Sequence, residues 1–426
     1  MTYNNLNEKM NKEKKQPKKI CLLASVFWPI YPGQGGRHAF VIGEILAKNG
    51  YDVTVVTTYP VDKKNKAQAA GVLLGREEIK GMKIIRVPSL LSKNPGFMNK
   101  LMFYISFMFT SLMALTVVRS ADVVIGLHPP PPYLYIPGAI FSKILQAKYV
   151  IRVTDVWPDV LFEHFNWPKS NLGKQIINLF VQHVQQHADH IMAFTPKIKQ
   201  RLITDGIAKD KLTTIEIAVD AELFSPNSKS KQQLSQDEHE LFSNNFIVLY
   251  SGAFTLSYDF DVFLDSAKHL EHHEDIRFVL LGDGAAKQQI IQKIDELQLD
   301  NVVLIPPVSD ASAVAQYINC ADVCTVPMKG VVADTMTRPS KTFEYWSCGK
   351  PVISSSIGEL PALIKESNAG IATKPGDHLE FAAAIQQLYM DHKVIIRMGK
   401  NARDFILNRF SYDCLELKLV DMIETV

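Results

Sequence analysis

Residues 338–353 read RPSKTFEYWSCGKPVI, and no other stretch of the chain predicts its local structure as clearly. Pro339 and Ser340 are residues that begin helices, whereas Gly349 is typical of a helix end and Pro351 prevents continuation. The apolar residues after Pro351 predict a buried strand. The stretch therefore predicts a short helix followed directly by a strand, the repeating unit of an α/β sheet.

The start of this predicted helix has the features of a diphosphate-binding site. Free backbone N–H groups and the positive end of the helix dipole favour an anion, and Lys341 adds an ammonium group in the first turn. Glu344 lies three residues further along on the same face, where its carboxylate could accept hydrogen bonds from ribose hydroxyls. For this segment alone, an ordinary strand–helix–strand connection with surface charges remains the alternative.

Length and composition place the chain among globular proteins with large cores. At 426 residues it is long enough for two or three domains, and 47% of its residues are hydrophobic while 21% are charged. The formal net charge of +2 argues against a dedicated nucleic-acid-binding protein, so no nucleic-acid partner is expected. Five scattered cysteines without a CxxC pair are typical of a reducing compartment, which predicts a cytoplasmic protein.

Residues 1–17 differ from the rest of the chain in composition. They are rich in lysine and no apolar run of a signal peptide follows them, so we expect a flexible basic leader. Such a leader could be a solvated tail or could contact an anionic membrane surface, and the sequence leaves both possibilities open.

Predicted strands and helices alternate along the rest of the chain, which is typical of parallel sheets covered by helices on both faces. The alternation occupies 18–222 and restarts after a polar run at 225–245, which we interpret as a linker or a surface loop. Two Rossmann-like, doubly wound domains are therefore predicted, at 18–222 and 223–411. Their ligands should bind in a cleft between them, at the carboxyl ends of the strands.

One segment, residues 101–118, does not fit this alternation. It contains eighteen residues without a formal charge, a length that barely reaches across a bilayer. Because predicted strands of one sheet precede and follow it, a crossing helix is excluded. The segment is either a buried core helix or an apolar surface helix that dips into lipid, as would suit an enzyme that acts on a lipid-linked substrate.

Glycine-rich and polar loops follow several predicted strands of the first unit. Gly33, Gly35 and Gly36 follow the first strand, where glycine lets the backbone approach a phosphate closely; a tight turn without a ligand is the alternative. His128 follows one later strand and Asp155 follows the next. Because the carboxyl ends of neighbouring parallel strands converge, we expect His128 and Asp155 to face a substrate.

Two histidines, His183 and His187, have the spacing of metal ligands on one helical face. The residues between them, Val184, Gln185 and Gln186, include no glutamate of the kind a zinc protease motif carries, and no carboxylate is placed to be a third ligand. A solvated helix face is the simpler interpretation, so we expect no metal site.

Taken together, these features resemble the retaining family-4 glycosyltransferases of the GT-B fold, over nearly the whole chain from Lys18. The matching motifs are spread over both predicted domains: Gly35-Gly36, 52–57 (DVTVVT), 281–284 (LGDG), 339–353 (PSK through PVI), 370–372 (GIA) and 375–377 (PGD). The DVWPD stretch at 155–159 resembles the DLWP signature of a bacterial subgroup that builds O-antigen, capsule and exopolysaccharide units. That subgroup includes N-acetylfucosaminyl- and fucosyl-transferase-like members.

The resemblance implies two Rossmann-like domains that face each other across a cleft, and a last helix, 412–426, that returns to the first domain. It also implies a UDP-linked sugar donor held mainly by the second domain, and no metal or other cofactor. Lys341, with Arg338 and the helix start at Ser340, would neutralise the leaving diphosphate. Glu344 would bind the ribose, and Gly282 would line the nucleotide pocket.

The first predicted domain would supply the remaining groups. By the same resemblance, backbone N–H groups of Gly35 and Gly36 would approach the phosphates. The role of a histidine that the family carries after an inner strand would pass to Asp155 or His128.

Two departures from the family pattern concern the donor site. The first of two glutamates that the family spaces by seven residues would fall at Met336. The usual Arg and Lys after the first strand of the second domain are missing from 251–259, which reads SGAFTLSYD. Lys341 would therefore carry more of the charge that balances the diphosphate.

The sequence thus predicts an enzyme that transfers a hexosyl or N-acetylhexosaminyl group, with retention, to a lipid-linked or glycan acceptor in bacterial surface polysaccharide synthesis. It would work at the inner face of the cell membrane, which residues 101–118 would contact. A GT-B-fold UDP-sugar 2-epimerase and a non-catalytic sugar-nucleotide-binding scaffold are the alternatives that the sequence leaves open.

Overall fold

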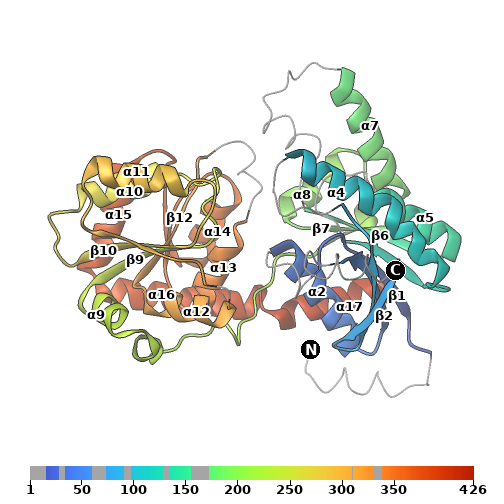
Figure 1. Ribbon diagram of the computed structural model, residues 1–426, viewed down its shortest axis with the longest axis horizontal. Coiled ribbons are helices and arrows are strands. Elements are labelled where there is room, and N and C mark those ends of the chain that lie inside the picture. Colours follow the sequence, from blue (N-terminus) through green and yellow to red (C-terminus); the bar gives the residue numbers. More distant parts are fainter. Residues whose placement is uncertain are drawn as a thin grey trace.

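The computed structural model describes residues 16–27, 34–59, 73–90, 97–127, 134–154, 172–308, 310–330 and 338–426. These residues form two α/β domains, each built around a mainly parallel sheet with helices packed on its faces (Figure 1). The predicted pair of doubly wound domains is confirmed.

The sheet of the first domain has eight strands in the order β3-β4-β2-β1-β5-β6-β7-β8, and only the β3–β4 pair is antiparallel. Its inner strands are short apolar runs because helices cover both faces. The bounds are β1 Lys19–Leu23, β2 Asp52–Thr58, β3 Gly75–Ile79, β4 Met82–Val87, β5 Val123–Gly126, β6 Lys148–Val153, β7 His190–Ala193 and β8 Leu212–Thr214.

The helices of the first domain pack against this sheet and around its edges. Figure 1 shows α4, α5 and α7 on one side and α2 on the other. The bounds are α2 Gln34–Lys48, α4 Phe97–Thr110, the 3₁₀ helix η1 Ser111–Thr116, α5 Tyr135–Leu145, α7 Leu172–His187, α8 Pro196–Thr204 and the 3₁₀ helix η3 Lys209–Lys211.

The second domain has a parallel sheet of six strands in the order β11-β10-β9-β12-β13-β14. Its strands are β9 Phe246–Ser251, β10 Ile276–Leu281, β11 Val302–Ile305, β12 Val323–Pro327, β13 Val352–Ser355 and β14 Gly370–Thr373. Its helices are the 3₁₀ helix η4 Ser230–Gln233, α9 Gln236–Asn244, α10 Phe260–His269, α11 Lys287–Leu297, α12 Ala311–Cys320, α13 Ser340–Ser347, α14 Glu359–Ser367, α15 His378–Met390 and α16 His392–Arg409.

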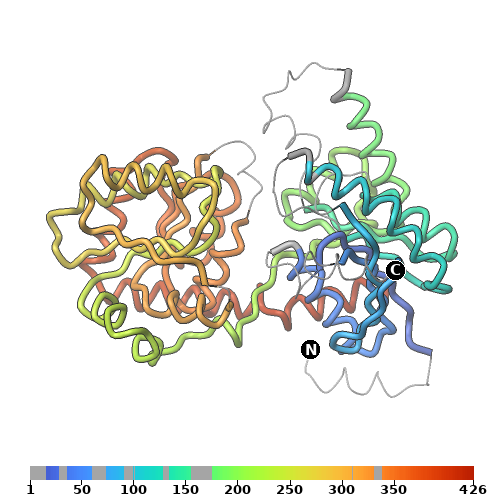
Figure 2. Tube along the Cα trace, viewed as in Figure 1, coloured from blue at the N-terminus to red at the C-terminus, as the bar shows by residue number. Residues whose placement is uncertain are grey.

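The last helix, α17 (Tyr412–Thr425), joins the two domains. Figure 2 shows the red end of the chain leaving the second domain and lying among the blue elements of the first. Leu419 and Ile423 are buried in the core that also contains Ile20 of β1, and the amine of Lys18 donates a 2.6 Å hydrogen bond to the carbonyl of Ile423. The chain therefore crosses between the domains twice, once after β8 and once before α17.

Residues 101–118 form the end of α4, the 3₁₀ helix η1 and two following residues, not one continuous helix. Phe107 is fully buried and Phe103 is only 5% exposed, whereas Phe109 is 61% exposed. No helix in the described part of the chain is long and apolar enough to cross a membrane. One side of the segment is thus core, as the first alternative requires, and the other side is exposed; its contact with lipid stays a prediction.

The polar run at 225–245, predicted as a linker or surface loop, contains η4 and the three-turn helix α9. Ser235 caps α9 because its hydroxyl oxygen accepts a hydrogen bond from the backbone N–H of Glu238, and the carboxylate of Glu238 accepts one from the backbone N–H of Ser235. Phe242 is fully buried and anchors the helix in the core of the second domain. The loop prediction was wrong because a capping box and one core residue outweigh a polar composition.

Candidate active site

Helix α13 (Ser340–Ser347) and strand β13 form as residues 338–353 predict. Cys348 caps the helix, and Gly349 follows it with φ of +71°, a left-handed conformation that favours glycine. The apolar side of α13 is fully buried, and the indole of Trp346 donates a 3.0 Å hydrogen bond to the carbonyl of Ala369 before β14. The core therefore fixes the helix, and its first turn is held at one position.

Lys341 extends from this first turn towards the carboxyl end of β9. Its side chain is almost completely buried, and its Nζ lies 3.8 Å from the ring centroid of Tyr250 and 3.9 Å from that of Tyr258. The amine has no hydrogen-bond partner among the described residues. Burial lowers the pKa of Lys341 well below its usual range, although the carboxylate of Glu344 opposes that shift.

The loops after β9 and β10 run against each other beside this amine. The backbone N–H of Gly252 donates to the carbonyl of Leu281, and a Cβ on Gly282 would lie 2.0 Å from the carbonyl oxygen of Gly252. Only glycine fits at position 282 for that reason. A Cβ on Gly252 would in turn lie 3.0 Å from Nζ of Lys341. The structure thus brings Gly282 and Lys341 together through Gly252.

A pocket of about 320 Å³, open to solvent, lies where the two domains meet. Helix α13 of the second domain contributes Ser340, Phe343 and Glu344 to its lining. The other lining residues are Arg37, His38, Ile217, Ala218, Val219, Asp220, Phe224 and Tyr412. Arg37 and His38 directly follow Gly35 and Gly36 at the start of α2, so the glycine-rich helix start and the start of α13 border the same pocket.

His38 is a pocket residue that the sequence analysis did not select. Its ring lies 6.4 Å from that of Phe194 in an edge-on arrangement. Burial, together with the positive charges of Arg152 and Arg37, lowers the pKa of His38 to about 3. The imidazole is therefore neutral at physiological pH and can accept or donate a hydrogen bond at the pocket. The only local signal was its place one residue after Arg37 at a helix start.

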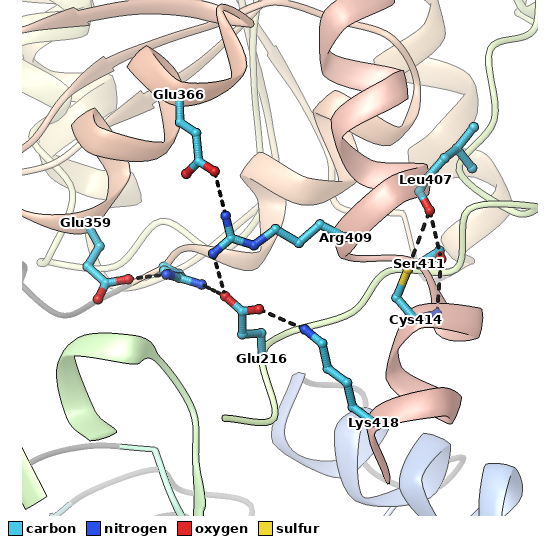
Figure 3. A network of polar contacts seen from close by, with 9 residues as sticks. Glu216, Glu359, Glu366, Leu407, Arg409, Ser411, Cys414 and Lys418 are labelled. Atoms are coloured by element: carbon cyan, nitrogen blue, oxygen red, sulfur yellow. Dashed lines mark hydrogen bonds and ion pairs between the residues drawn. The ribbon is translucent and has the colours of Figure 1, made fainter. Parts of the chain in front are cut away.

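Arg338 lies in a buried network of ion pairs at the junction of the domains. Its guanidinium pairs with Glu359 of α14 and, at 2.6 Å, with Glu216, which follows β8 of the first domain. Glu216 also accepts hydrogen bonds of 3.0 Å from Arg409 and from Lys418 of α17 (Figure 3). The structure gives Arg338 a part in joining the domains, and its predicted contact with the diphosphate stays a prediction.

Gly33, His128, Asp155 and Met336 lie outside the described residues. The strands that precede His128 and Asp155, β5 and β6, are parallel neighbours, and Gly126 at the end of β5 pairs with Ile151, two residues before the end of β6. The exits of both strands are thus at one edge of the sheet, as the prediction requires.

The two histidines at metal-ligand spacing are also accounted for. Nδ1 of His187 lies 2.7 Å from the carbonyl oxygen of His183 in the same helix, and the two rings are tilted by 41° with their centroids 4.1 Å apart. Within the described part of the chain, no group of three His, Cys, Asp or Glu side chains is placed to hold a metal ion.

Two family models match the chain, one for each domain. Residues 35–223 match the model described as Glycosyltransferase Family 4, and residues 245–391 match the model described as Glycosyl transferases group 1. Together they cover most of the chain and both sides of the pocket. The chain belongs to the GT-B glycosyltransferases. The family-4 assignment is confirmed, whereas neither model tests membership of the DLWP subgroup.

Curated relatives of this glycosyltransferase are distant. A chitobiosyldiphosphodolichol beta-mannosyltransferase of Candida albicans is 24% identical over 67% of this chain and 64% of its own length. The capsular polysaccharide biosynthesis glycosyltransferase CapM of Staphylococcus aureus is 23% identical over 56% of this chain and 62% of its own length. The chain therefore spans less than two thirds of the length of these relatives.

Solved structures agree with the fold over nearly the whole glycosyltransferase chain. Sucrose-phosphate synthase of Thermosynechococcus elongatus superimposes with a TM-score of 0.74 at 18% identity, over 96% of this chain and 98% of its own. The Anabaena protein HepE, in complex with UDP-glucose, superimposes with a TM-score of 0.69 at 16% identity, over 96% of this chain and 100% of its own. The GT-B fold is confirmed.

Proposed function

We propose that this chain transfers a sugar from a UDP-linked donor to a lipid-linked or glycan acceptor during synthesis of a bacterial surface polysaccharide. The observation that carries the proposal is the buried amine of Lys341, which has no hydrogen-bond partner among the described residues and lies beside the glycine loops after β9 and β10. A buried ammonium without a partner is unfavourable by itself and becomes favourable when an anion binds. The diphosphate of a nucleotide sugar is such an anion.

The known relatives support the donor and acceptor classes. HepE binds UDP-glucose with the same fold, CapM acts in capsule synthesis, and the Candida relative is named for a diphosphodolichol-linked acceptor. An N-acetylfucosaminyl or fucosyl donor is the finer assignment that the DVWPD stretch at 155–159 favours.

Each side of the pocket has a role in the proposed reaction. Lys341 and the N-terminus of α13 would stabilise the charge that develops on the leaving diphosphate, and Glu344 would hold the ribose hydroxyls. Gly282 would line the nucleotide pocket, and the start of α2 would contribute backbone N–H groups from Gly35 and Gly36. Asp155 and His128 would act on the acceptor side.

The proposed stereochemical course is retention. The leaving phosphate would accept the proton of the acceptor hydroxyl on the same face of the sugar as the new bond forms. This course requires no pair of carboxylates of the kind that glycosidases use. It also requires no divalent ion, because Lys341 and the helix dipole provide the positive charge.

Product analysis tests the function directly. The purified chain is incubated with UDP-linked sugars and a polyprenyl-diphosphate-linked acceptor, with and without chelator, and the anomeric configuration of the product is determined. The expected result is a new glycan with the donor's anomeric configuration and undiminished yield in chelator. A donor isomerised at C2 with no glycan formed would contradict transfer. A product of opposite configuration would contradict retention, and rescue of a chelated enzyme by Mg²⁺ or Mn²⁺ would contradict metal independence.

A further inference from the structure

The amine of Lys341 is held between two aromatic rings instead of beside a carboxylate. Nζ lies 3.8 Å from the ring centroid of Tyr250 on β9 and 3.9 Å from that of Tyr258, which follows β9. Distances this short from an ammonium to two ring centroids are characteristic of cation–π contacts. Both rings come from the β9 region, 91 and 83 residues before Lys341 in the sequence.

The rings are themselves fixed by the second domain. The hydroxyl of Tyr250 donates a 2.7 Å hydrogen bond to the carbonyl of Ala253, and its ring packs edge-on against Tyr258 and Phe260 at centroid distances of 5.3 and 5.0 Å. Tyr258 is held at its backbone by a bridge to Met328. Two ring faces at fixed positions restrict where the lysine amine can lie.

Gly252 leaves the space that the amine occupies. Its φ is +134°, and a Cβ there would lie 3.0 Å from Nζ and 3.2 Å from Cε of Lys341. Any larger residue at position 252 would displace the end of the lysine side chain. The segment 251–259, which lacks the basic pair of the family pattern, therefore supplies the surroundings of a lysine from another element.

An aromatic ring and a carboxylate differ in how many N–H donors of a neighbouring ammonium they occupy. An ammonium has three N–H donors and no acceptor, and a carboxylate partner would both occupy donors and neutralise the charge. A ring face attracts the cation through its quadrupole and leaves the net positive charge in place. A lysine held in this way keeps all of its N–H donors available for an incoming anion.

We propose that Tyr250 and Tyr258 are positioning residues that hold the amine of Lys341 by their ring faces so that its donors meet the diphosphate of the sugar donor. This inference rests on the proposed function. In the family pattern, an Arg and a Lys at 251–259 provide positive charge for the diphosphate. In this chain, the two tyrosines would instead position Lys341, which provides that charge.

A double-mutant cycle tests the inference with the full chain. Tyr258 is the first target because it is partly exposed, whereas Tyr250 belongs to the buried core. Tyr258→Leu removes the ring, and Tyr258→Phe keeps it. We expect Tyr258→Leu to lower kcat/KM for the donor, and the affinity for UDP measured by calorimetry, by about tenfold, with Tyr258→Phe within about threefold of wild type.

The second arm repeats Tyr258→Leu in a Lys341→Met background. If Tyr258 acts through the amine, its loss should have no further effect there. The same loss of UDP affinity in both backgrounds would overturn the positioning role and leave the proposed function intact. A wild-type chain that binds no nucleotide and forms no glycan would overturn the proposed function itself.

A glycine pair gives an independent check that leaves both rings in place. Gly252→Ala should weaken UDP binding because the new methyl group displaces Nζ of Lys341. Gly206→Ala is the matched control: Gly206 also has a positive φ, of +94°, but a Cβ there would meet no atom within 4 Å. Equal UDP affinity for the two variants, both folded by thermal melting, would contradict the inference.

Discussion

Lys341 destabilises the folded protein and is also the residue proposed to bind the diphosphate. Burial disfavours its charged form, and no hydrogen bond from the described residues compensates for it. The pKa of Lys341 is lower in the folded chain than in the unfolded chain. At any pH below the unfolded pKa, Lys341 therefore lowers the free energy of unfolding, and this destabilisation disappears as the pH rises through the unfolded pKa. At neutral pH the free protein therefore bears this cost, which a bound diphosphate would offset.

A first prediction concerns Lys341→Met, which keeps the length of the side chain and removes the charge. Without ligand at pH 7, the variant should melt at a higher temperature than wild type. Its turnover should fall by about 10²- to 10³-fold, the effect of losing one well-placed electrostatic group. Thermal melting without UDP measures the stability of the free protein, and melting with UDP measures nucleotide binding. The UDP-dependent increase in melting temperature should be large in wild type and small in the variant. A variant that is less stable and fully active would contradict the assignment.

A second residue-scale prediction separates binding from chemistry at Glu344. The proposed partners of this carboxylate are ribose hydroxyls, which do not change during transfer. Glu344→Gln should therefore weaken UDP affinity, measured by calorimetry, by about tenfold while kcat at saturating donor stays within about threefold of wild type. Ser340→Ala, at the other pocket position of the helix, serves as the comparison. A fall in kcat with unchanged affinity would mean that Glu344 takes part in the reaction step.

At the scale of elements, α4 has one face in the core and one exposed. Phe107 belongs to the core of the first domain, whereas Met102 and Phe109 are 41% and 61% exposed and lie seven residues apart, on one side of the helix. Ile144 of the neighbouring α5 is also exposed. An apolar surface of this kind is suited to insertion into the boundary between headgroups and acyl chains.

The prediction at this scale is that the exposed face of α4 binds bilayers. Met102→Ser combined with Phe109→Ser should reduce binding to liposomes with anionic lipid by at least about tenfold, from the apolar area no longer buried in lipid. The measurement is co-sedimentation, with UDP-dependent thermal melting to show that the second domain is intact. Ile396→Ser, on α16 of the second domain, is the matched control because its exposed fraction equals that of Phe109. Equal binding of all three proteins would contradict a lipid contact through α4.

A change at Phe103 or Phe107 would not test the lipid contact, because loss of those buried rings would destabilise the core by about 3 kcal/mol or more.

At the scale of the whole molecule, Glu216 connects elements from both domains. Arg338 reaches it from the segment just before α13. Arg409 reaches it from the end of α16 and Lys418 from α17 (Figure 3). Burial disfavours its ionisation, but hydrogen bonds from Arg338, Arg409 and Lys418 outweigh burial and lower the pKa of Glu216 to about 2. A carboxylate with a depressed pKa stabilises the folded state above its unfolded pKa of about 4.5, and this contribution is lost as the pH falls from there towards 2.

Glu216→Gln should therefore lower the melting temperature at pH 7, because three cations lose a buried counter-charge at an expected cost of about 3 kcal/mol. The difference from wild type should narrow as the pH falls below about 5, because Glu216 of the unfolded wild-type chain then takes up a proton that the folded chain, with a pKa of about 2 at this carboxyl, does not. Glu366→Gln is the control: Glu366 also pairs with Arg409 but is 54% exposed, so its loss should change the melting temperature little. A difference between Glu216→Gln and wild type that stays constant from pH 7 to pH 4 would contradict this electrostatic role.

Features that depend on neighbouring residues could be predicted from the amino-acid sequence. Local backbone chemistry predicts the start and end of α13 and the beginning of β13 after Pro351. Apolar periodicity predicts the buried strands. Helix α9 could also have been predicted, since Ser235 and Glu238 form a capping box that the polar composition of 225–245 obscured.

The surroundings of each charge, and the buried face of each helix, depend instead on contacts between segments that are distant in the chain. Lys341 meets Tyr250 and Tyr258 because parallel strands bring distant loops to one edge of a sheet. Arg338 meets Glu216, 122 residues away, because the two domains are in contact there. In the same way, Phe107 is core and Phe109 is surface because η1 and the sheet lie on one side of α4 only. These contacts join residues that are far apart in sequence, so no local pattern encodes them, whereas the caps, turns and apolar runs are encoded within a few residues.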